Sequence, residues 1–374
     1  MVEQRFFFNK DALVIKGPKK SHALRMFMLA AVMICGVYIC SDALVIKGPK
    51  KSHALRMFML AAVMICGVYI CSVCLTQLGI QSRPRKLKME IMEAPCKNPA
   101  IPYYEIPYVH YPEPNTYSRD ECACTPVRFF SIVSMQRSGS GWFETLLNSH
   151  VNISSNGEIF SSKERRGNIS AIIRALDKVY NLDWYSSAAK NDCTAAVGLK
   201  WMLNQGLMEN HVKVAKYFSR RGVSLIFLFR RNLLRRLVSQ LANDHDRNTK
   251  QLNGTHKAHV HSTNEANILA RYKPRINTSE LISTLRHTHK FITDAMGHFR
   301  NTRHIVLYYE DLVQNRTKLM DVLEFLRVPP RKLVSRHVKI HTRPLPKLVE
   351  NWDDVYRSLE GTEYRSFLNA NYDL

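Results

Sequence analysis

Acidic residues are scarce in this sequence. It contains 31 aspartates and glutamates against 54 lysines and arginines, so its 374 residues carry a formal net charge of +23. A charge of this sign and size indicates an anionic partner, and nucleic acid, an anionic cofactor, an acidic glycan and anionic lipid head groups all satisfy it. Hydrophobic residues make up 45% of the chain, which excludes a disordered protein and indicates a globular one.

Cysteine is scarce beyond the N-terminal apolar segments. Of nine cysteines, only Cys96, Cys122, Cys124 and Cys193 lie C-terminal to those segments. Four cysteines in an oxidising compartment permit two disulfides, and the sequence leaves three pairings open. Cys122 and Cys124 have no second Cys/His pair at zinc-finger spacing, so we predict no metal site there.

Long hydrophobic runs occur within a repeated segment near the N-terminus. Residues 11–41 recur without a change at 42–72, and each copy carries an apolar run preceded by basic residues. The first run, 26–40, is too short to cross a bilayer, whereas the second continues over 57–80 and is long enough. We therefore expect a cytoplasmic tail over 1–56 and a transmembrane anchor over 57–80. The basic residues ahead of the anchor favour a luminal C-terminal part.

The chain beyond the anchor carries features of a luminal protein. Asn-x-Ser/Thr sequons begin at Asn152, Asn168, Asn253, Asn277 and Asn315. Residues 81–125 are rich in proline, tyrosine and charge and show no helical or strand period. This composition predicts an extended luminal stem.

From residue 126 onward, apolar strands alternate with amphipathic helices. We predict strands over 127–134, 195–202, 223–229 and 304–310, and helices over 142–150, 169–180, 210–221, 232–242, 279–299 and 317–326. This alternation is typical of an α/β domain, three layers thick, with a central parallel sheet between helices. Ligands of such sheets bind at the C-terminal ends of the strands. We expect residues 126–374 to form this domain.

The stretch "SIVSMQRSGSGWFETLL", residues 131–147, reads as a strand, a Gly/Ser turn and a helix. Such a turn directs backbone N–H groups and a helix N-terminus at an anion. Nucleotide hydrolases complete this loop with Lys and Ser/Thr, whose hydroxyl holds Mg²⁺. Here Gly139 is followed by Ser140, Gly141 and Trp142. The loop therefore predicts a phosphate cradle without the usual metal-binding hydroxyl.

Two further strands end in charged residues. "LIFLFRRNLLRRLVSQ" brings Arg230 and Arg231 to a strand end, with Ser239 two helical turns beyond Arg231. An arginine and a hydroxyl so spaced can bind a second phosphate, although a solvated basic patch has the same pattern. "HIVLYYEDL" ends in Glu310 and Asp311, which fit either a capped helix or a Mg²⁺-binding carboxylate.

Together these stretches resemble the sulfotransferase superfamily, whose donor is 3′-phosphoadenosine 5′-phosphosulfate (PAPS). The 5′-phosphosulfate loop of that family resembles the run Arg137, Ser138, Gly139, Ser140, Gly141 and Trp142, and its 3′-phosphate motif resembles Arg231 and Ser239. "KIHTRPLPKLVENWDD" resembles the tail of nodulation-type and plant membrane-anchored members. Leu233 departs from the proline that many members have.

The resemblance implies a P-loop-type fold and a role for each of these residues. Arg137 to Trp142 would hold the 5′-phosphosulfate, while Arg231 and Ser239 would hold the 3′-phosphate. Sulfuryl transfer needs no metal, because backbone N–H donors and a fixed cation can stabilise it. Trp142 fits equally well as a core aromatic residue. A Golgi location, with the catalytic domain in the lumen, follows from the expected topology and from donor supply in the family.

Two charged residues are candidates for catalysis. The resemblance places a catalytic glutamate near Glu158 in "SSNGEIF", where it would accept the proton of the acceptor hydroxyl. Lys200 interrupts the apolar strand "VGLKWM" and would contact the sulfuryl group or the acceptor. Each residue also has an ordinary alternative, as a surface-loop glutamate and a partly exposed strand lysine.

The irregular segment 245–274 predicts a lid or an acceptor-binding loop. It contains His245, His256, His259 and His261, which form no recognisable metal-ligand set. Lys339 and Arg343 are further candidates for closing over the donor, with surface exposure as the simpler interpretation.

The sequence thus predicts a membrane-anchored luminal sulfotransferase that uses PAPS, no metal and no nucleic acid. Its acceptor would be a glycan hydroxyl, or else a tyrosine of a secreted protein. One alternative is a P-loop nucleotide kinase or hydrolase, which would require Mg²⁺. The other is a non-catalytic membrane protein that binds acidic glycans through its basic surface.

Overall fold

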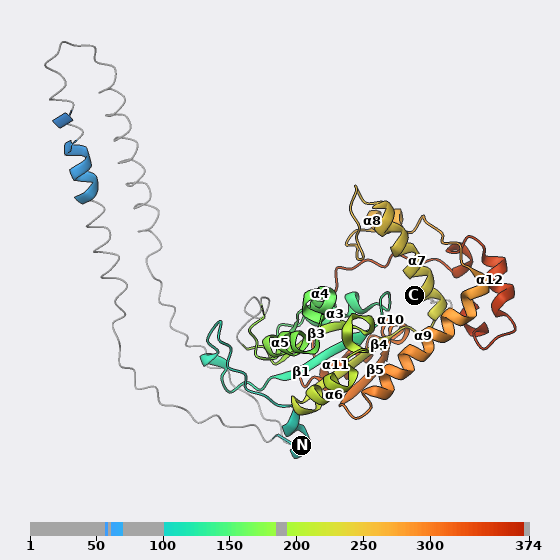
Figure 1. The fold of residues 1–374 in the computed structure, drawn as a ribbon, viewed down its shortest axis with the longest axis horizontal. Helices are drawn as coiled ribbons and strands as arrows, with labels where there is room; N and C mark the ends of the chain where they lie inside the picture. Colours follow the sequence, from blue (N-terminus) through green and yellow to red (C-terminus); the bar gives the residue numbers. More distant parts are fainter. Residues whose placement is uncertain (1–56, 59–60, 70–100, 185–192, 370–374) are drawn as a thin grey trace, which may run out of the picture. The chain divides into compact units, whose positions relative to one another are not determined.

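The computed structural model describes residues 57–58, 61–69, 101–184 and 193–369 (Figure 1). The chain divides into two units, Met1–Glu93 and Ala94–Leu374. In the first unit, residues 57–58 and 61–69 are helical. The predicted tail 1–56, most of the predicted anchor 57–80 and the predicted stem up to residue 100 lie outside the described residues. Among the residues that are described, no helix is both long enough and apolar enough to cross a membrane.

The second unit is built on a parallel sheet of five strands in the order β2-β3-β1-β4-β5. The predicted α/β fold with a central parallel sheet is therefore confirmed. The strands are β1 Arg128–Ser134, β2 Ile153–Ser155, β3 Ala196–Met202, β4 Val223–Phe229 and β5 His304–Tyr308. The helices are α3 Ser140–Asn148, α4 Lys163–Arg166, α5 Ile169–Tyr180, α6 His211–Arg220, α7 Leu233–Thr249, α8 Thr263–Leu269, α9 Thr278–His298, α10 Tyr309–Gln314, α11 Lys318–Phe325 and α12 Trp352–Leu359.

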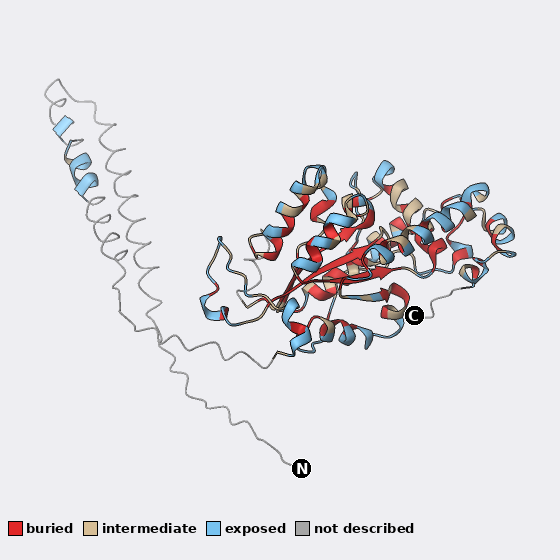
Figure 2. Ribbon diagram, turned by 60° about the horizontal axis from the view of Figure 1, so that its bottom comes forward, coloured by how far each residue is buried: buried red, intermediate tan, exposed pale blue. Residues whose placement is uncertain are grey.

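Helices cover both faces of the sheet. On one face, residues of β1 and β4 such as Phe130 and Ile226 pack against α3 and α11. On the other face, their neighbours along the strands, such as Phe129 and Phe227, pack against α5, α6, α7 and α9. Because side chains alternate along a strand, a strand buried on both sides reads as a continuous apolar run. Figure 2 shows this arrangement: β1 to β4 are buried, the edge strand β5 is partly exposed, and the helices are buried on the side that faces the sheet.

Two boundaries differ from the sequence prediction. The strand predicted over 304–310 ends at Tyr308, and Tyr309 begins α10, so Glu310 and Asp311 lie in the first turn of a helix. The stem predicted over 81–125 is also not extended throughout, because part of it belongs to the folded unit. Its residues form the short helices η1 Tyr103–Tyr108 and η2 Asp120–Cys122. The backbones of His110 and Val127 pair as an antiparallel bridge.

A disulfide and a buried carboxylate attach this segment to the domain. Cys122 is bonded to Cys193, 71 residues further along the chain. Glu105 is buried, and it pairs with Arg128 at 3.1 Å, Arg327 at 3.0 Å and Arg303 at 3.4 Å. Burial alone would raise the pKa of Glu105, but the hydrogen bond from Arg327 and the charges of the other two arginines lower it below its usual value.

Glu105→Gln tests how much this cluster stabilises the domain. We expect a loss of about 3 kcal/mol in the free energy of unfolding at pH 7, because three arginines lose their buried counter-ion. Since the folded pKa is lowered, the stabilisation by Glu105 is present above the unfolded pKa and is lost as the pH falls through the folded value. The difference between the two proteins should therefore shrink in acid.

Urea unfolding of the two proteins from pH 7 to pH 3 measures this difference. Glu113→Gln is the matched control, because Glu113 lies in the same segment and is exposed. It should change stability by less than about 0.5 kcal/mol. Equal stability of the Glu105 and Glu113 variants would contradict the expected role of Glu105.

Candidate active site

The loop between β1 and α3 has the shape of an anion cradle. Two of its residues adopt left-handed backbone, Arg137 with φ 65° and Gly139 with φ 82°. A Cβ atom on Gly139 would collide with the ring of Tyr309, and one on Gly141 would collide with the ring of His259. Glycine is therefore required at both positions for the backbone to pass beneath these rings. The first N–H groups of α3 have no acceptor within the helix and remain available for an anion.

A cavity of about 470 Å³ lies over this loop, at the C-terminal ends of the strands. The predicted residues Arg137, Gly139, Ser140, Gly141, Trp142, Glu158 and Ser239 all line it. Ser138 is buried and is not part of the lining. The remaining walls come from α7, from residues 258–260, from α10 and from residues 337–341. Its volume is within the range of small-molecule sites.

Arg137 connects the loop to α7. Its Nε donates to Ser239 Oγ at 3.0 Å, and its guanidinium also donates to Asn243 at 3.2 Å and to the carbonyl of Ala258 at 2.8 Å. Arg137 and Ser239, which the sequence assigned to two different phosphates, are thus in direct contact. Burial first, and then the charge of Arg230, lower the pKa of Arg137 to about 10.

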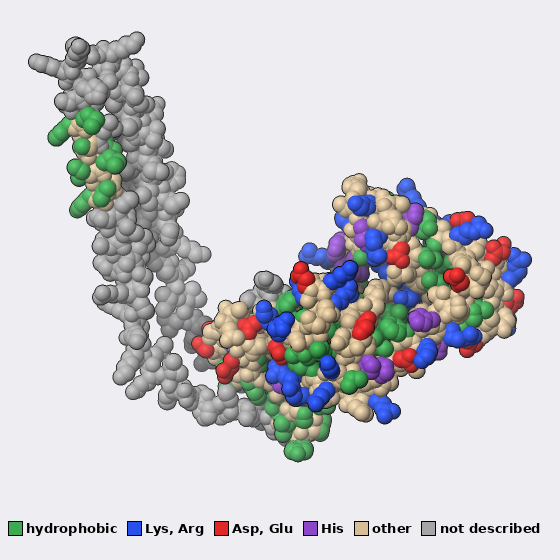
Figure 3. All heavy atoms as spheres, in the orientation of Figure 1, with side chains coloured by type: hydrophobic (Ala, Val, Ile, Leu, Met, Phe, Trp, Pro, Cys, Tyr) green, Lys and Arg blue, Asp and Glu red, His purple; other side chains and the backbone are tan. Residues whose placement is uncertain are grey.

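More basic side chains line the same cavity, among them Lys339, which is charged at pH 7, and His341, which is neutral at that pH. Burial and the neighbouring arginines lower the pKa of Lys339 to about 8, and they lower that of His341 to about 4. Nδ1 of His341 and Nδ1 of His337 are buried and have no hydrogen-bond partner among the described residues. On the visible surface, by contrast, Lys and Arg side chains are interspersed with Asp and Glu (Figure 3). Arg230 lies 3.8 Å from Glu310, but the lining of the cavity itself contains more basic than acidic side chains, which suits an anionic ligand.

Arg230, and not Arg231, faces this cavity. Arg230 lines it and lies 5.0 Å from the centre of the Tyr309 ring. Arg231 is mostly exposed; it binds Asp311 through two hydrogen bonds of 2.7 and 3.2 Å and lies 3.9 Å from the Tyr308 ring. Consecutive residues at a strand end point in opposite directions, so only one of the two can enter the site.

Glu310 and Asp311 hold in place the turn that carries Arg230 and Arg231, called the arginine turn below. Glu310 accepts hydrogen bonds from the backbone N–H groups of Arg231 and Asn232 at 3.0 and 3.2 Å, and Asp311 pairs with Arg231. Neither carboxylate lines the cavity. Their positions match the capped-helix interpretation of the sequence better than a carboxylate directed at a nucleotide-bound metal.

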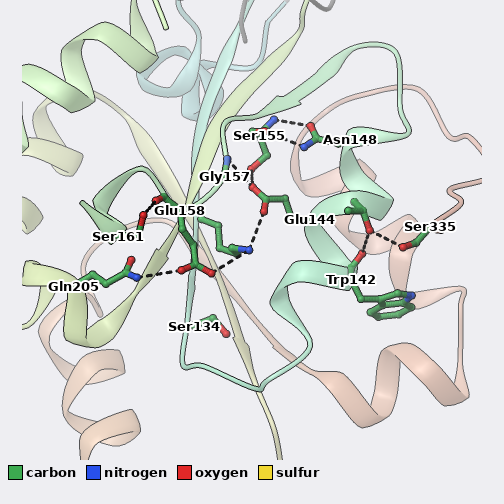
Figure 4. A network of polar contacts seen from close by, with 12 residues as sticks. Ser134, Trp142, Glu144, Asn148, Ser155, Gly157, Glu158, Ser161, Gln205 and Ser335 are labelled. Atoms are coloured by element: carbon green, nitrogen blue, oxygen red, sulfur yellow. Dashed lines mark hydrogen bonds and ion pairs between the residues drawn. The ribbon is translucent and has the colours of Figure 1, made fainter. Parts of the chain in front are cut away.

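Glu158 and Lys200 belong to one network of ion pairs (Figure 4). Lys200 Nζ lies 3.0 Å from Glu144 and 3.2 Å from Glu158. The second oxygen of Glu158 accepts a hydrogen bond from Gln205 at 3.1 Å. Glu144 also accepts from the Ser155 hydroxyl at 2.6 Å and from the Gly157 N–H at 2.9 Å. Burial lowers the proton affinity of Lys200, but both carboxylates oppose this and its pKa is raised overall.

Lys200 points toward α3 because of its place in the strand. Ala196, which packs on the α3 face, lies four residues earlier, and side chains of that spacing share a face. Buried in this way, Lys200 itself does not line the cavity, whereas Glu158 does. The two predicted catalytic residues are therefore in contact, but only the carboxylate can touch a ligand there.

His259 is the other candidate base in the cavity. Burial first, and then the charges of Lys200 and Arg137, lower its pKa to about 3. The ring is neutral at pH 7, and protonating it among cations is unfavourable. Glu158, which lines the same cavity, remains the other candidate proton acceptor. Among the described residues, no group of three or more His, Cys, Asp and Glu is arranged to hold a metal.

Sequence reasoning missed several residues of the site. Glu144 looked like an ordinary polar residue of an amphipathic helix, and Tyr309 looked like the end of a strand. For Glu144 the sequence contained one usable signal. It lies five residues beyond Gly139, on the same side of the sheet as Lys200. Tyr309 had none, because its contact with Gly139 joins segments 170 residues apart in the chain.

Comparison with known proteins finds a similar curated sequence and some likeness to solved structures. No family model matches the chain. It is 23% identical over 254 residues to Nodulation protein H of Rhizobium meliloti, a match that covers 66% of this chain and 98% of that protein. The sulfotransferase domain from the curacin biosynthetic pathway matches 54% of this chain and 75% of that chain, with 16% identity and a TM-score of 0.28. A sulfotransferase from Alicyclobacillus acidocaldarius matches 64% of this chain and 97% of that chain, with 13% identity and a TM-score of 0.33.

The lowered pKa of Lys339 predicts pH-dependent anion binding. Below pH 8 the ammonium is charged and attracts an anion, and above pH 8 that charge is lost. Affinity for sulfate, which does not titrate in this range, should therefore fall as the pH rises from 7 to 9.5. Lys339→Arg should remove the fall, because arginine stays charged.

Calorimetric titration with sodium sulfate at constant ionic strength measures this dependence. Lys332→Arg is the control, because Lys332 is exposed and lies outside the cavity, and this variant should retain the fall. A sulfate affinity independent of pH in the unmodified protein would contradict the assignment.

Proposed function

We propose that this chain, whose resemblance to the sulfotransferase superfamily is confirmed by its similarity to Nodulation protein H, is a sulfotransferase that uses PAPS. The observation that carries the proposal is the cavity lined by Arg137, Arg230 and Lys339 over a glycine cradle without a Lys-Ser/Thr pair. The donor is a nucleotide with several anionic groups. Such a ligand would relieve the repulsion by Arg230 that, after burial, lowers the pKa values of Arg137 and Lys339.

The cationic residues would bind and orient the donor. Backbone N–H groups of α3, beginning at Ser140, would cradle its 5′-phosphosulfate. Arg137, Arg230 and Lys339 would neutralise its charge and stabilise the negative charge that develops on the leaving phosphate oxygen. The rings of Trp142 and Tyr309 provide apolar surface, and their centroids lie 5.7 Å apart in an edge-to-face arrangement.

Glu158 would act as the general base. The donor supplies an activated sulfuryl group: sulfur bonds to the acceptor oxygen, and the bond to the phosphate oxygen breaks with its electron pair leaving on the phosphate. Glu158 takes the proton of the acceptor hydroxyl. Lys200 and Gln205 each bind one oxygen of Glu158 and thereby orient it. Lys200 is thus assigned a positioning role, with no contact to the sulfuryl group.

The acceptor and the location are further parts of the proposal. We propose a glycan hydroxyl as the acceptor, in keeping with the nodulation-type resemblance. A single membrane anchor over 57–80, with the catalytic unit in the Golgi lumen, is proposed from the apolar run and the sequons alone. Protease protection and glycosidase sensitivity of the full chain in microsomes test this topology.

Binding of adenosine 3′,5′-bisphosphate, the desulfated donor, tests the proposed donor. We expect binding without metal, and a loss of tenfold or more in Arg230→Ala, because a charge-assisted hydrogen bond contributes about 1.5–3 kcal/mol. Arg231→Ala should change the affinity less than about threefold, since it loses only contacts outside the cavity, an exposed ion pair with Asp311 and the contact with the Tyr308 ring.

Calorimetry of the full chain, with ATP and Mg²⁺ as the competing ligand, makes the measurement. Preference for ATP with Mg²⁺ would refute the sulfotransferase and favour a kinase or hydrolase. A larger loss of affinity in Arg231→Ala than in Arg230→Ala would agree with the proposed activity. It would assign the binding of the 3′-phosphate to Arg231 instead of Arg230, as the family resemblance implies.

Glu158→Gln tests the general base. We expect kcat to fall by about 10²- to 10⁴-fold, because the amide cannot accept the proton, while bisphosphate affinity stays within about twofold. Transfer of radiolabelled sulfate from PAPS to pooled glycans gives the rate. Glu164→Gln is the control, since Glu164 is exposed and outside the cavity. Unchanged transfer by Glu158→Gln would exclude Glu158 as the base.

A further inference from the structure

A second cavity, of about 280 Å³, lies beside the donor cavity. The two share Gln136, Gln240 and Arg247 as lining residues. The chain passes from one cavity to the other at the end of β3. Met202 lines the donor cavity, whereas the next residues, Leu203 and Asn204, line the second cavity. Gln205, the next residue, binds Glu158. The second cavity is therefore next to the proposed base.

Arg236 is the unusual residue of this cavity. It lines the cavity and is only 9% exposed. Its Nε atom is buried and has no hydrogen-bond partner, and no carboxylate pairs with its guanidinium among the described residues. A buried, unpaired charge is costly, so a protein that retains one there is built to pair it with a ligand.

The charge of Arg236 persists at neutral pH. Burial first, and then the nearby Arg230, lower its pKa to about 10. Arg236 does not line the donor cavity, so its unpaired guanidinium is left for a different anion. Arg247, one of the residues shared by both cavities, adds a second cation at the exposed side and pairs with Asp244 at 3.3 Å.

The cavity also contains an unused acceptor. Gln240 donates its amide nitrogen to both oxygens of Asp244, at 3.1 and 3.0 Å. Because a carboxylate only accepts, this contact fixes the orientation of the amide and directs its oxygen away from Asp244. That oxygen is buried without a partner. A ligand that satisfies the site must therefore offer an anion to Arg236 and a hydroxyl or amide N–H to Gln240.

The remaining lining has the chemistry of a carbohydrate site. Gln136 and Asn204 are amides joined by a hydrogen bond of 2.6 Å, and Phe291 of α9 adds an aromatic ring. On α7, Arg236, Gln240, Asn243 and Arg247 follow the spacing i, i+4, i+7 and i+11, so they form one stripe along the helix. This single stripe lines both cavities, with Asn243 binding Arg137 in the first and Arg236 lying in the second.

We propose that this second cavity is the acceptor subsite and that it binds an acidic sugar, with Arg236 pairing the carboxylate or sulfate ester of the acceptor and Gln240 accepting a hydrogen bond from its hydroxyl. The proposal rests on the sulfotransferase function proposed above and names its acceptor class. It makes Arg236 a specificity-determining residue, separate from the residues that hold the donor.

The experiment uses the full chain saturated with adenosine 3′,5′-bisphosphate. The probes are a tetrasaccharide of glucuronic acid and N-acetylglucosamine and the same tetrasaccharide with its carboxyl groups reduced to alcohols. We expect the acidic form to bind at least tenfold more tightly than the reduced form in calorimetry. Arg236→Met should erase this difference, and it should raise the thermal midpoint of unfolding, because it removes an unpaired buried charge. Arg220→Met, at an exposed residue of α6, should retain the difference.

Three results would overturn the proposal. The first is equal or absent binding of the two saccharides by a protein that binds the bisphosphate. The second is a preference for the acidic form that persists in Arg236→Met. The third is a tenfold loss of bisphosphate affinity in Arg236→Met, which would assign the arginine to the donor. Failure of the proposed function is separate: the unmodified protein would then not bind the bisphosphate at all.

Discussion

The pairing of Lys200 with Glu144 and Glu158 is the interaction on which the arrangement of the site depends. A lysine in the middle of a buried strand must be paired, and Lys200 satisfies this with one carboxylate from α3 and one from the loop after β2. The same Glu144 binds Ser155 and the Gly157 N–H. The helix that follows the anion cradle is thereby joined to the loop that carries the proposed base. One buried cation thereby fixes the position of the proposed base relative to the proposed donor loop.

The carboxylates of the site lie on its α3 side, whereas its arginines lie on its α7 side. On the α3 side, two carboxylates surround one lysine. On the α7 side, Arg137, Arg230 and Arg236 lie near one another, and burial with mutual repulsion lowers the pKa of Arg137 and Arg236. Repulsion of this kind destabilises the protein without its ligand and is relieved when anions bind. A few of the 54 lysines and arginines thus lie in a cavity, while others are spread over the surface.

Aromatic rings pack between these two regions. Tyr309 lies against Gly139, in edge contact with Trp142 and within cation–π distance of Arg230 and Lys339. Glu310, the next residue, holds the backbone of the arginine turn. The first turn of α10 therefore supports the cradle and determines which arginine enters the cavity. A segment that the sequence presented as the end of a strand acts as a structural support for the site.

The sequence by itself determined the α/β alternation, the central parallel sheet and the anion loop, because apolar periodicity and turn residues are local properties of the chain. The loop pattern and the family resemblance also pointed to Arg137, Ser239 and Glu158, which line the cavity. Only the tertiary structure decided that Arg230 rather than Arg231 faces the cavity, that Lys200 pairs with Glu144 and Glu158, and that Tyr309 and Arg236 line the two cavities. These outcomes depend on which way a side chain points and what it meets across the sheet. Such contacts join residues far apart in the chain, and no local pattern records them.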